Sequence, residues 1–355
     1  MVQFVDVRNV VDLVAEVGAE PLLLGLAGYI EDDFRRWPVF EKRPRVASHS
    51  REGVIELMPV SDGEHYAFKY VNGHPANAST GLQTVAAFGM LADVSTGYPL
   101  FLSEMTIMTA LRTAATSALA AKYLARRDSK TMAMIGLGAQ SEFQALAFRA
   151  LLGVRMLRVF DIDAGATAKF VRNLAPLGFS IRRTASVGEA ASGADIITTA
   201  TADKRKATIL KDDMVGRRVH INAVGGDCPG KTELDRKILK RAEVFVEYAP
   251  QTRIEGEIQQ MEPDFPVTEL WQVVTGGAQG RRTAGQVTLF DSVGFAIEDF
   301  SALRFLRDHV RGTRHVSALD LLPEPRDPRD LYGLIAGGEN ARAALHDGAL
   351  PRVAA

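Results

Sequence analysis

The segment Thr131-Met-Ala-Met-Ile-Gly-Leu-Gly-Ala-Gln140 decides the fold. Its first five residues form an apolar run typical of a buried strand, and Gly136 and Gly138 follow directly. The next residues have the apolar spacing of a helix, and Gly153 stands where a C-terminal cap is expected. A strand, a glycine turn and a helix in this order are typical of a dinucleotide-binding fold.

The next strand supplies an acidic residue at its end. Residues 156–160 are expected to be this strand, and Asp161 follows at close to the spacing of roughly 20 residues expected for the carboxylate that accepts a ribose hydroxyl. No arginine follows directly, which favours NAD over NADP. Ser141 replaces the third glycine of the fingerprint, so a glycine turn in a fold without a nucleotide stays an alternative.

Further strands alternate with helical segments, which indicates a doubly wound parallel sheet. We expect strands over 194–199, 219–224, 244–246 and 285–290, and an amphipathic helix over 295–310. Because ligands bind outside the carboxyl ends of such strands, we expect the residues after them to surround one crevice. The residues expected near one another at these strand ends are Thr201, Asn222, Asp227, Ser292 and Val293, and Asp203 stands near the end of the strand over 194–199.

The N-terminal region has a mixed helix and strand pattern. The expected elements are a helix over 9–36, strands over 43–47, 53–59 and 66–71, a strand and turn over 83–98 with Thr84 at its head, and a helix over 106–126. This pattern favours an α+β region beside the parallel sheet.

Four charged residues interrupt apolar or small-residue surfaces of these elements. Alternation gives Glu56 and Lys69 apolar neighbours on their strand faces, and Arg45 lies on the preceding strand. Arg112 shares a helix stripe with threonines. Each residue alone fits an exposed or edge position. Together, the charges on consecutive strands favour a cluster that holds an anion, and arginine suits bidentate carboxylate contacts.

Asp227 is a lone carboxylate after a buried strand and two glycines, in Ile221-Asn-Ala-Val-Gly-Gly-Asp-Cys-Pro-Gly-Lys-Thr-Glu-Leu234. Glycine lets backbone come close to a ligand, so a bound group here would have a proton carrier beside it. The alternative is that Asp227 caps a helix starting near Thr232. Cys228 is interpreted as a packing residue.

Composition excludes several classes of protein. The 355 residues include 42 Lys plus Arg and 43 Asp plus Glu, so the net charge of −1 gives no footprint for nucleic acid or an anionic membrane. The single cysteine excludes an internal disulfide and favours a reducing compartment. Neither a signal peptide nor a membrane helix is expected, and the default is a cytoplasmic protein without a metal site.

The sequence resembles the ornithine cyclodeaminase/μ-crystallin family over about residues 40 to 300. The matching blocks are Arg45-Val-Ala-Ser-His-Ser50, Gly53-Val-Ile-Glu-Leu-Met-Pro59, Phe68-Lys-Tyr-Val-Asn-Gly-His-Pro-Ala-Asn77, Leu111-Arg-Thr-Ala-Ala-Thr116, Gly136-x-Gly-Ala-Gln-Ser-Glu-Phe143, Asn222 to Leu234, Glu247-Tyr-x-Pro-Gln-Thr-Arg-Ile-Glu-Gly-Glu257 and Phe290-Asp-Ser-Val-Gly294. The segment from Gly225 to Leu234 is characteristic of the cyclodeaminase branch.

This resemblance implies a fold and an activity. The fold would be a Rossmann-type NAD-binding domain over 118–314 beside a substrate-binding and dimerisation domain built from 1–117 and 315–355. The activity would be that of an ammonia-lyase that cyclises L-ornithine to L-proline, with NAD reduced and re-oxidised in one turnover: oxidation to an imine, attack by the δ-amine, loss of ammonia and re-reduction. It also implies a cytoplasmic homodimer in proline biosynthesis and ornithine or arginine catabolism.

The resemblance also assigns roles to single residues. Arg45, Lys69 and Arg112 would hold the substrate carboxylate, Glu56 would be an acidic group near the reacting carbon, Asp227 would be the general acid/base at the substrate amines, and Val293 would line the pocket. The implied cofactor contacts include the two glycines of the turn, Gly136 and Gly138. The others are Thr84, Arg112, Ala139, Gln140, Asp161, Thr201, Asn222, Ala223, Val224, Gly225, Lys231 and Ser292.

Three other activities stay open on this scaffold. A ketimine reductase or amino-acid dehydrogenase would consume or form external NAD(P)H and would have no special need for Asp227. A lysine cyclodeaminase differs by one methylene in its substrate, which a pocket discriminates only modestly. A binding protein like μ-crystallin is disfavoured because Arg45, Glu56, Lys69 and Asp227 are all present.

Overall fold

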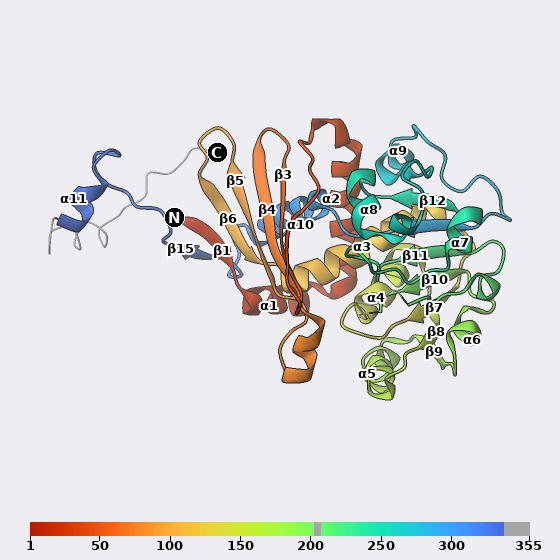
Figure 1. The fold of residues 1–355 in the computed structure, drawn as a ribbon. Coiled ribbons are helices and arrows are strands. Elements are labelled where there is room, and N and C mark those ends of the chain that lie inside the picture. Colours follow the sequence, from red (N-terminus) through yellow and green to blue (C-terminus); the bar gives the residue numbers. More distant parts are fainter. Residues whose placement is uncertain (202–206, 337–355) are drawn as a thin grey trace.

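The chain forms two β-sheets that meet at a pair of long helices (Figure 1). The structure, a computed structural model, describes residues 1–201 and 207–336. It confirms the expected parallel, doubly wound sheet beside an α+β region. Asp203, expected near the end of one parallel strand, lies outside the described residues.

The first sheet has seven described strands in the order β15-β1-β6-β5-β4-β3-β2. Its neighbouring strands are antiparallel, except that β1 and β6 are parallel. The strands are β1 (Val2–Val5), β2 (Val46–His49), β3 (Val54–Ser61), β4 (His65–Gly73), β5 (Ala87–Asp93), β6 (Pro99–Glu104) and β15 (Ser317–Leu319).

The second sheet has eight described strands, all parallel, in the order β13-β12-β14-β11-β10-β7-β8-β9. Strands β7 and β10 are neighbours, and the chain continues from them in opposite directions: β8 and β9 lie beyond β7, and β11 and the later strands lie beyond β10. A ligand crevice is expected at the carboxyl ends of β7 and β10, where the direction changes. The strands are β7 (Thr131–Ile135), β8 (Met156–Phe160), β9 (Ser180–Arg183), β10 (Ile196–Thr199), β11 (His220–Ala223), β12 (Glu243–Val246), β13 (Thr268–Glu269) and β14 (Thr288–Asp291).

Helices join and cover the sheets. The α-helices are α1 (Val7–Val17), α2 (Ala19–Arg35), α3 (Thr106–Leu124), α4 (Ser141–Leu152), α5 (Ala164–Leu174), α6 (Val187–Ala191), α7 (Arg236–Arg241), α8 (Ala249–Glu255), α9 (Leu270–Val274), α10 (Ala296–Val310) and α11 (Leu331–Ala336). The 3₁₀ turns are η1 (Trp37–Val39), η2 (Pro75–Thr80), η3 (Ala175–Leu177), η4 (Asp212–Met214) and η5 (Glu257–Gln260).

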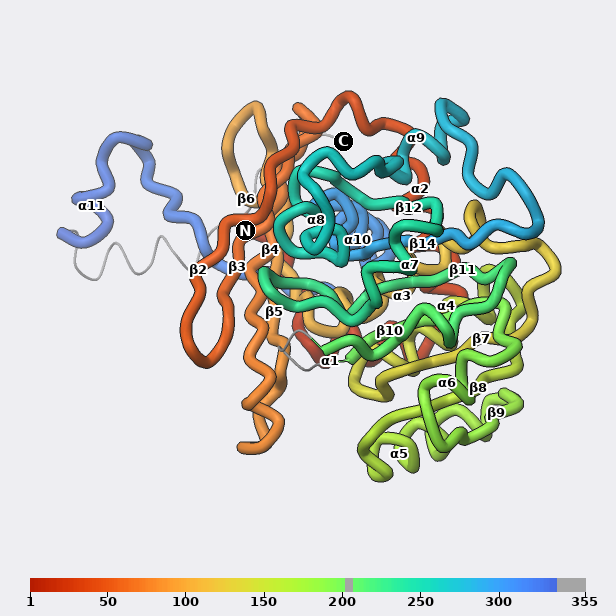
Figure 2. The backbone as a smooth tube through the Cα atoms, turned by 45° about the vertical axis from the view of Figure 1, so that its right-hand side comes forward, coloured from red at the N-terminus to blue at the C-terminus, as the bar shows by residue number. Residues whose placement is uncertain are grey.

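Helices α3 and α10 form the centre of the molecule, as the turned view in Figure 2 shows. Helix α10 packs against β3, β4, β5, α2 and α3, and α3 also contacts the parallel sheet at β11 and β14. The expected amphipathic character of residues 295–310 holds only for the last turns of α10, where Asp308 and His309 are exposed. In the first turns Glu298, Asp299 and Ser301 are as buried as Phe300 and Leu303. Polar groups are therefore placed deep inside the molecule.

Several element boundaries differ from the sequence prediction, and three of them bear on the site. The helix expected over 9–36 is two helices separated at Gly18. The strand expected over 43–47 begins only at Val46, so Arg45 precedes it. The helix expected near Thr232 begins at Arg236, because Asp235 accepts a hydrogen bond from Lys237 N and caps it.

The domain boundaries at 117/118 and 314/315 stay a prediction, and residues 337–355 of the second segment lie outside the described part of the chain. Strand β15 pairs with β1 and so returns the chain to the first sheet. Within residues 1–201 and 207–336, no helix is long and apolar enough to cross a membrane.

Candidate active site

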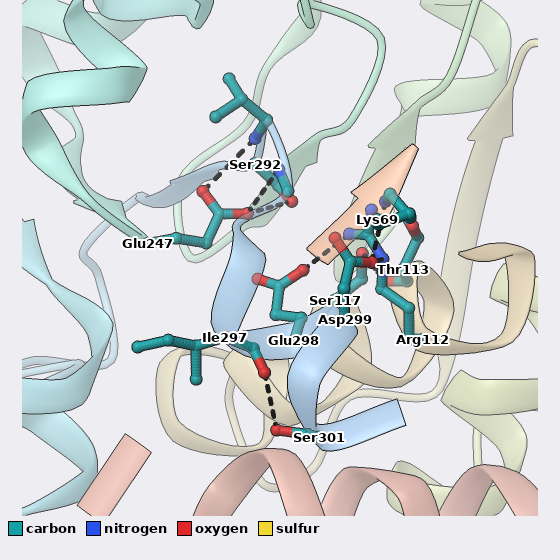
Figure 3. Close-up of polar contacts among 12 residues, drawn as sticks. Lys69, Arg112, Thr113, Ser117, Glu247, Ser292, Ile297, Glu298, Asp299 and Ser301 are labelled. Atoms are coloured by element: carbon teal, nitrogen blue, oxygen red, sulfur yellow. Dashed lines mark hydrogen bonds and ion pairs between the residues drawn. The ribbon is translucent and has the colours of Figure 1, made fainter. Parts of the chain in front are cut away.

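A buried cluster of ion pairs lies at the start of α10 (Figure 3). Lys69 Nζ on β4 lies 2.8 Å from Asp299 Oδ1, and its side chain is only 1% exposed. Arg112 on α3 forms ion pairs with both acidic residues of α10: Nη1 donates a hydrogen bond to Glu298 Oε2 at 2.7 Å, and Nε lies 2.9 Å from Asp299 Oδ1. The Asp299 carboxylate of α10 thus joins β4 of the first sheet to helix α3.

The strand pattern explains why Lys69 and Glu56 face inward. On β4, Lys69 shares its buried face with Ala67 and Val71, and on β3 Glu56 is buried between Val54 and Met58. Glu56 pairs across the strands with Val71. The faces predicted from period-two alternation are confirmed.

Arg45 connects strand β3 of the first sheet to helix α8 and to the segment that follows β14 of the second sheet. Its guanidinium contacts Glu56 Oε2 at 3.0 Å and Glu255 Oε2 at 3.1 Å. Its Nη2 donates to the carbonyls of Val293 and Gly294 at 2.5 and 2.7 Å. The structure therefore joins Arg45, Glu56 and Val293 into one group, although β2 itself starts one residue later.

Burial shifts the proton affinities of this cluster. Burial and, after it, the charge of Arg112 lower the pKa of Lys69 to about 8, while Asp299 opposes the change. Burial also raises the pKa of Glu298 to about 8 against the attraction of Arg112. It raises the pKa of Glu255 to about 7, with Arg45 opposing. The cluster thus holds groups that exchange protons near neutral pH.

The segment after β14 is shaped around Arg112. Glu247 at the end of β12 accepts hydrogen bonds from Ser292 Oγ at 2.6 Å, Gly294 N at 3.2 Å and Val293 N at 3.3 Å. Gly294 has a φ of 74°, and a Cβ there would lie 2.6 Å from Arg112 Nη1. Only glycine allows this close approach without displacing the guanidinium.

Asp227 lies beside this cluster, beyond the carboxyl end of β11 in the parallel sheet. Its side chain is 56% exposed and lies 3.3 Å from Lys231 Nζ, which also donates to the Thr201 carbonyl at 3.0 Å. The Asp227 charge contributes to the raised pKa of Glu255, so the two carboxylates are within electrostatic reach. Asp227 does not cap α7, so the alternative capping role is wrong.

The glycine turn after β7 forms a cradle that fits a dinucleotide. Gly136 has a φ of 89°, and a Cβ there would lie 2.6 Å from the Ala200 carbonyl oxygen. Gly138 is exposed and has open space at its Cβ position, so a phosphate can approach the backbone. Ser141, in place of the third glycine, is buried and donates to the Gly138 carbonyl at 2.8 Å.

Asp161 completes the cradle at the end of β8. Its carboxylate accepts hydrogen bonds from Leu137 N at 2.6 Å and Asp163 N at 2.8 Å, which fixes it against the glycine turn. Exposed Ala139 lies on the same turn, and Gln140 donates its side-chain amide to the Ala110 carbonyl of α3. These features fit NAD, whose ribose would meet Asp161 and whose pyrophosphate would meet the turn.

The remaining predicted cofactor contacts lie in separate parts of the fold. Asn222 and Ala223 end β11, and Val224 and Gly225 follow it. The Asn222 side chain is buried and hydrogen-bonded to His220 and Thr198, so only its backbone is available to a cofactor. Thr201 donates to Glu233 through its backbone N at 2.9 Å. Thr84 precedes β5 in the first sheet, where its carbonyl accepts from His74 N at 2.8 Å.

Sequence reasoning missed five buried polar residues of the site. They are Glu247, Gln251, Glu255, Glu298 and Asp299. A signal was present for two of them, because Glu298-Asp299 interrupts the apolar pattern of residues 295–306.

Comparisons with known proteins agree with this geometry. A family model described as "Ornithine cyclodeaminase/mu-crystallin family" matches residues 7–314. The chain is 66% identical over 335 residues to an ornithine cyclodeaminase of Agrobacterium fabrum, covering 94% of this chain and 95% of the relative. A lysine cyclodeaminase structure that addresses recognition of L-lysine, L-ornithine and L-2,4-diaminobutyric acid is 32% identical, with a TM-score of 0.87 over 93% of this chain and 98% of that one. A dimeric archaeal alanine dehydrogenase with bound NAD is 30% identical, with a TM-score of 0.80 over 87% and 96%.

Proposed function

The chain belongs to the ornithine cyclodeaminase/mu-crystallin family, and on this premise we propose that it is an NAD-dependent ammonia-lyase that cyclises L-ornithine to L-proline. The observation that carries the proposal is a half-exposed carboxylate, Asp227, beside a buried group of three cations. Such a site can hold an amino acid by its carboxylate and move protons on its amines.

Arg45, Lys69 and Arg112 bind the substrate carboxylate. Each cation is already fixed by internal carboxylates of Glu56, Asp299 and Glu298, so little reorganisation is needed when substrate arrives. A carboxylate held by these groups fixes the adjacent Cα toward the crevice of the parallel sheet. This is catalysis by orientation.

Asp227 moves protons at the substrate amines. Amines are ammonium ions at neutral pH and must lose a proton before one can attack carbon or the other can stabilise an iminium. A carboxylate at the rim can take that proton and return it to the departing ammonia. Glu56, held by Arg45, supplies a second carboxylate near the reacting carbon.

The cradle would hold NAD, which would supply the redox chemistry of a hydride that leaves Cα and returns within the same turnover. The proposed holding residues are Gly136, Gly138, Ala139, Asp161 and the backbone after β11, with Thr84, Arg112, Gln140, Thr201, Lys231 and Ser292 around them. Val293, whose carbonyl anchors Arg45, lines the substrate pocket.

Purified protein given L-ornithine is expected to release ammonia and L-proline in equal amounts, without net formation of NADH. The absorbance of NADH and the yield of both products check this directly. Accumulation of NADH in proportion to ornithine consumed would instead support a dehydrogenase. L-Lysine and L-2,4-diaminobutyric acid in the same assay test which chain length the pocket prefers.

We also propose a cytoplasmic homodimer that forms through the outer face of the first sheet and acts in proline biosynthesis and ornithine or arginine catabolism. This face carries a row of cross-strand neighbours, Leu57, Tyr70 and Phe88, of which Tyr70 and Phe88 stack with ring centroids 5.1 Å apart. Exposed apolar residues Val46 and Ile55 extend the row. A continuous exposed apolar surface of this kind is typical of an interface.

Leu57→Glu is expected to convert the dimer to monomer, because the side chain is 44% exposed within this row and a charge would be buried against the partner. Light scattering coupled to size exclusion measures the mass. Leu24→Glu is the matched control, since Leu24 is 48% exposed on α2. An unchanged dimer in the Leu57 variant would exclude this face.

A further inference from the structure

The loop that carries Asp227 has little structure of its own. Residues 224–231 form bends and turns without helix or strand. In the part of the chain that the structure describes, Lys231 is the one residue that hydrogen-bonds or ion-pairs with the Asp227 side chain. The position of the Asp227 carboxylate therefore depends on the contacts that other residues make with the backbone of this loop.

Gln259 on η5 holds that backbone. Its Oε1 accepts from Gly230 N at 2.7 Å. Its Nε2 lies within hydrogen-bond distance of the carbonyls of Lys231 at 3.0 Å and Cys228 at 3.3 Å, and of Glu255 and Gly256 in its own segment. One side chain thus spans the turn directly after Asp227 and ties it to η5.

Turn η5 is itself anchored to the parallel sheet. The Asp291 carboxylate at the end of β14 accepts from Glu257 N at 2.8 Å and Ile258 N at 2.9 Å. The Glu257 carboxylate accepts from Glu233 N at 2.6 Å and Leu234 N at 3.1 Å, beyond the loop. A Cβ on Gly226 would lie 2.9 Å from Glu257 Oε1, so the loop lies directly on this turn.

The preceding helix, α8, holds the opposite side of the site. Gln251 Oε1 accepts from Arg45 N at 3.1 Å, and its Nε2 donates to the Gly294 carbonyl at 2.7 Å. Glu255 lies 3.1 Å from Arg45 Nε. Residues 251–259 therefore contact the carboxylate-binding arginine at one end and the Asp227 loop at the other.

We propose that Gln259 is a positioning residue that fixes Asp227 for proton transfer, and that Gln251 is its counterpart for Arg45. The two glutamines stand eight residues apart in sequence, Gln251 on α8 and Gln259 on η5, which follows it. One serves substrate binding and the other serves proton transfer. The inference rests on the proposed function, because it assigns the two contacts to proton transfer and to substrate binding respectively.

The test compares Gln259→Met with Gln251→Met in the full chain. Gln259→Met removes both hydrogen-bonding groups at nearly constant volume, and kcat for L-ornithine is expected to fall on the order of 10²-fold with KM changed less than about twofold, as for a small misplacement of a reacting group. Gln251→Met is expected to raise KM about tenfold with a smaller change in kcat. Gln259→Glu, which keeps an acceptor for Gly230 but loses the amide donor, is expected to behave like Gln259→Met.

Hydrogen exchange supplies a readout that does not depend on activity. Amides of residues 226–231 are expected to exchange faster in Gln259→Met than in wild type, and at the wild-type rate in Gln251→Met, while both variants bind NAD normally. Wild-type kcat in Gln259→Met, unchanged loop exchange, or the same kcat and KM effects in both variants would overturn the inference. If wild-type protein forms no proline, the proposed function fails, and the exchange comparison still tests whether Gln259 holds the loop.

Discussion

Asp227→Ala is expected to abolish cyclisation of L-ornithine while NAD binding stays close to that of wild type. Loss of a positioned proton carrier lowers kcat by about 10²–10⁴-fold, and two amines depend on this one carboxylate. Asp227 is at the edge of the crevice and contacts Lys231, whose second hydrogen bond to the Thr201 carbonyl remains. The variant therefore keeps the backbone that meets the cofactor.

The stability of Asp227→Ala separates a catalytic from a structural role. Because the carboxylate is more than half exposed, its ion pair contributes at most about 1 kcal/mol. The matched control is Asp235→Ala, which removes the N-cap of α7 and is expected to cost about 1 kcal/mol of unfolding free energy with kcat unchanged. Turnover near the wild-type rate in Asp227→Ala would remove Asp227 from the mechanism.

The sequence predicted the parts of the site that local patterns determine. Alternation along a strand has a period of two, so the inward faces of Glu56 and Lys69 could be read without knowing their partners. The turn from Gly136 to Ser141 and the acidic end of β8 are likewise contiguous features, and the structure places them together.

The partners of these residues could not be predicted in the same way. Asp299 meets Lys69 from 230 positions away, and Glu298 meets Arg112 from 186 positions away. Only the packing of α10 between α3 and the first sheet brings them together. The start of α7 was misplaced for a related reason: Leu210 bridges Leu234 and holds the chain extended until Asp235.

Lys69→Met is expected to lower both the affinity for L-ornithine and the stability of the fold. Removing a charged hydrogen-bond donor from the carboxylate site weakens binding by about 1.5–3 kcal/mol, or roughly 10- to 150-fold in Kd. The same change leaves Asp299 buried with only Arg112 to compensate it. Breaking a buried ion pair in this way costs about 3–5 kcal/mol of unfolding free energy, and the contact from Arg112 places the expected loss at the lower end.

The double variant Lys69→Met/Asp299→Asn distinguishes these two effects. The double variant lacks both charges of the 2.8 Å pair, so no buried carboxylate is left without its lysine partner. Its free energy of unfolding, measured with denaturant, is therefore expected to recover most of what Lys69→Met loses. The kcat/KM for ornithine is expected to stay low, because neither methionine nor asparagine supplies a cation to the substrate. Recovery of kcat/KM together with stability would mean that Lys69 acts only in folding and that Arg45 and Arg112 alone bind the carboxylate.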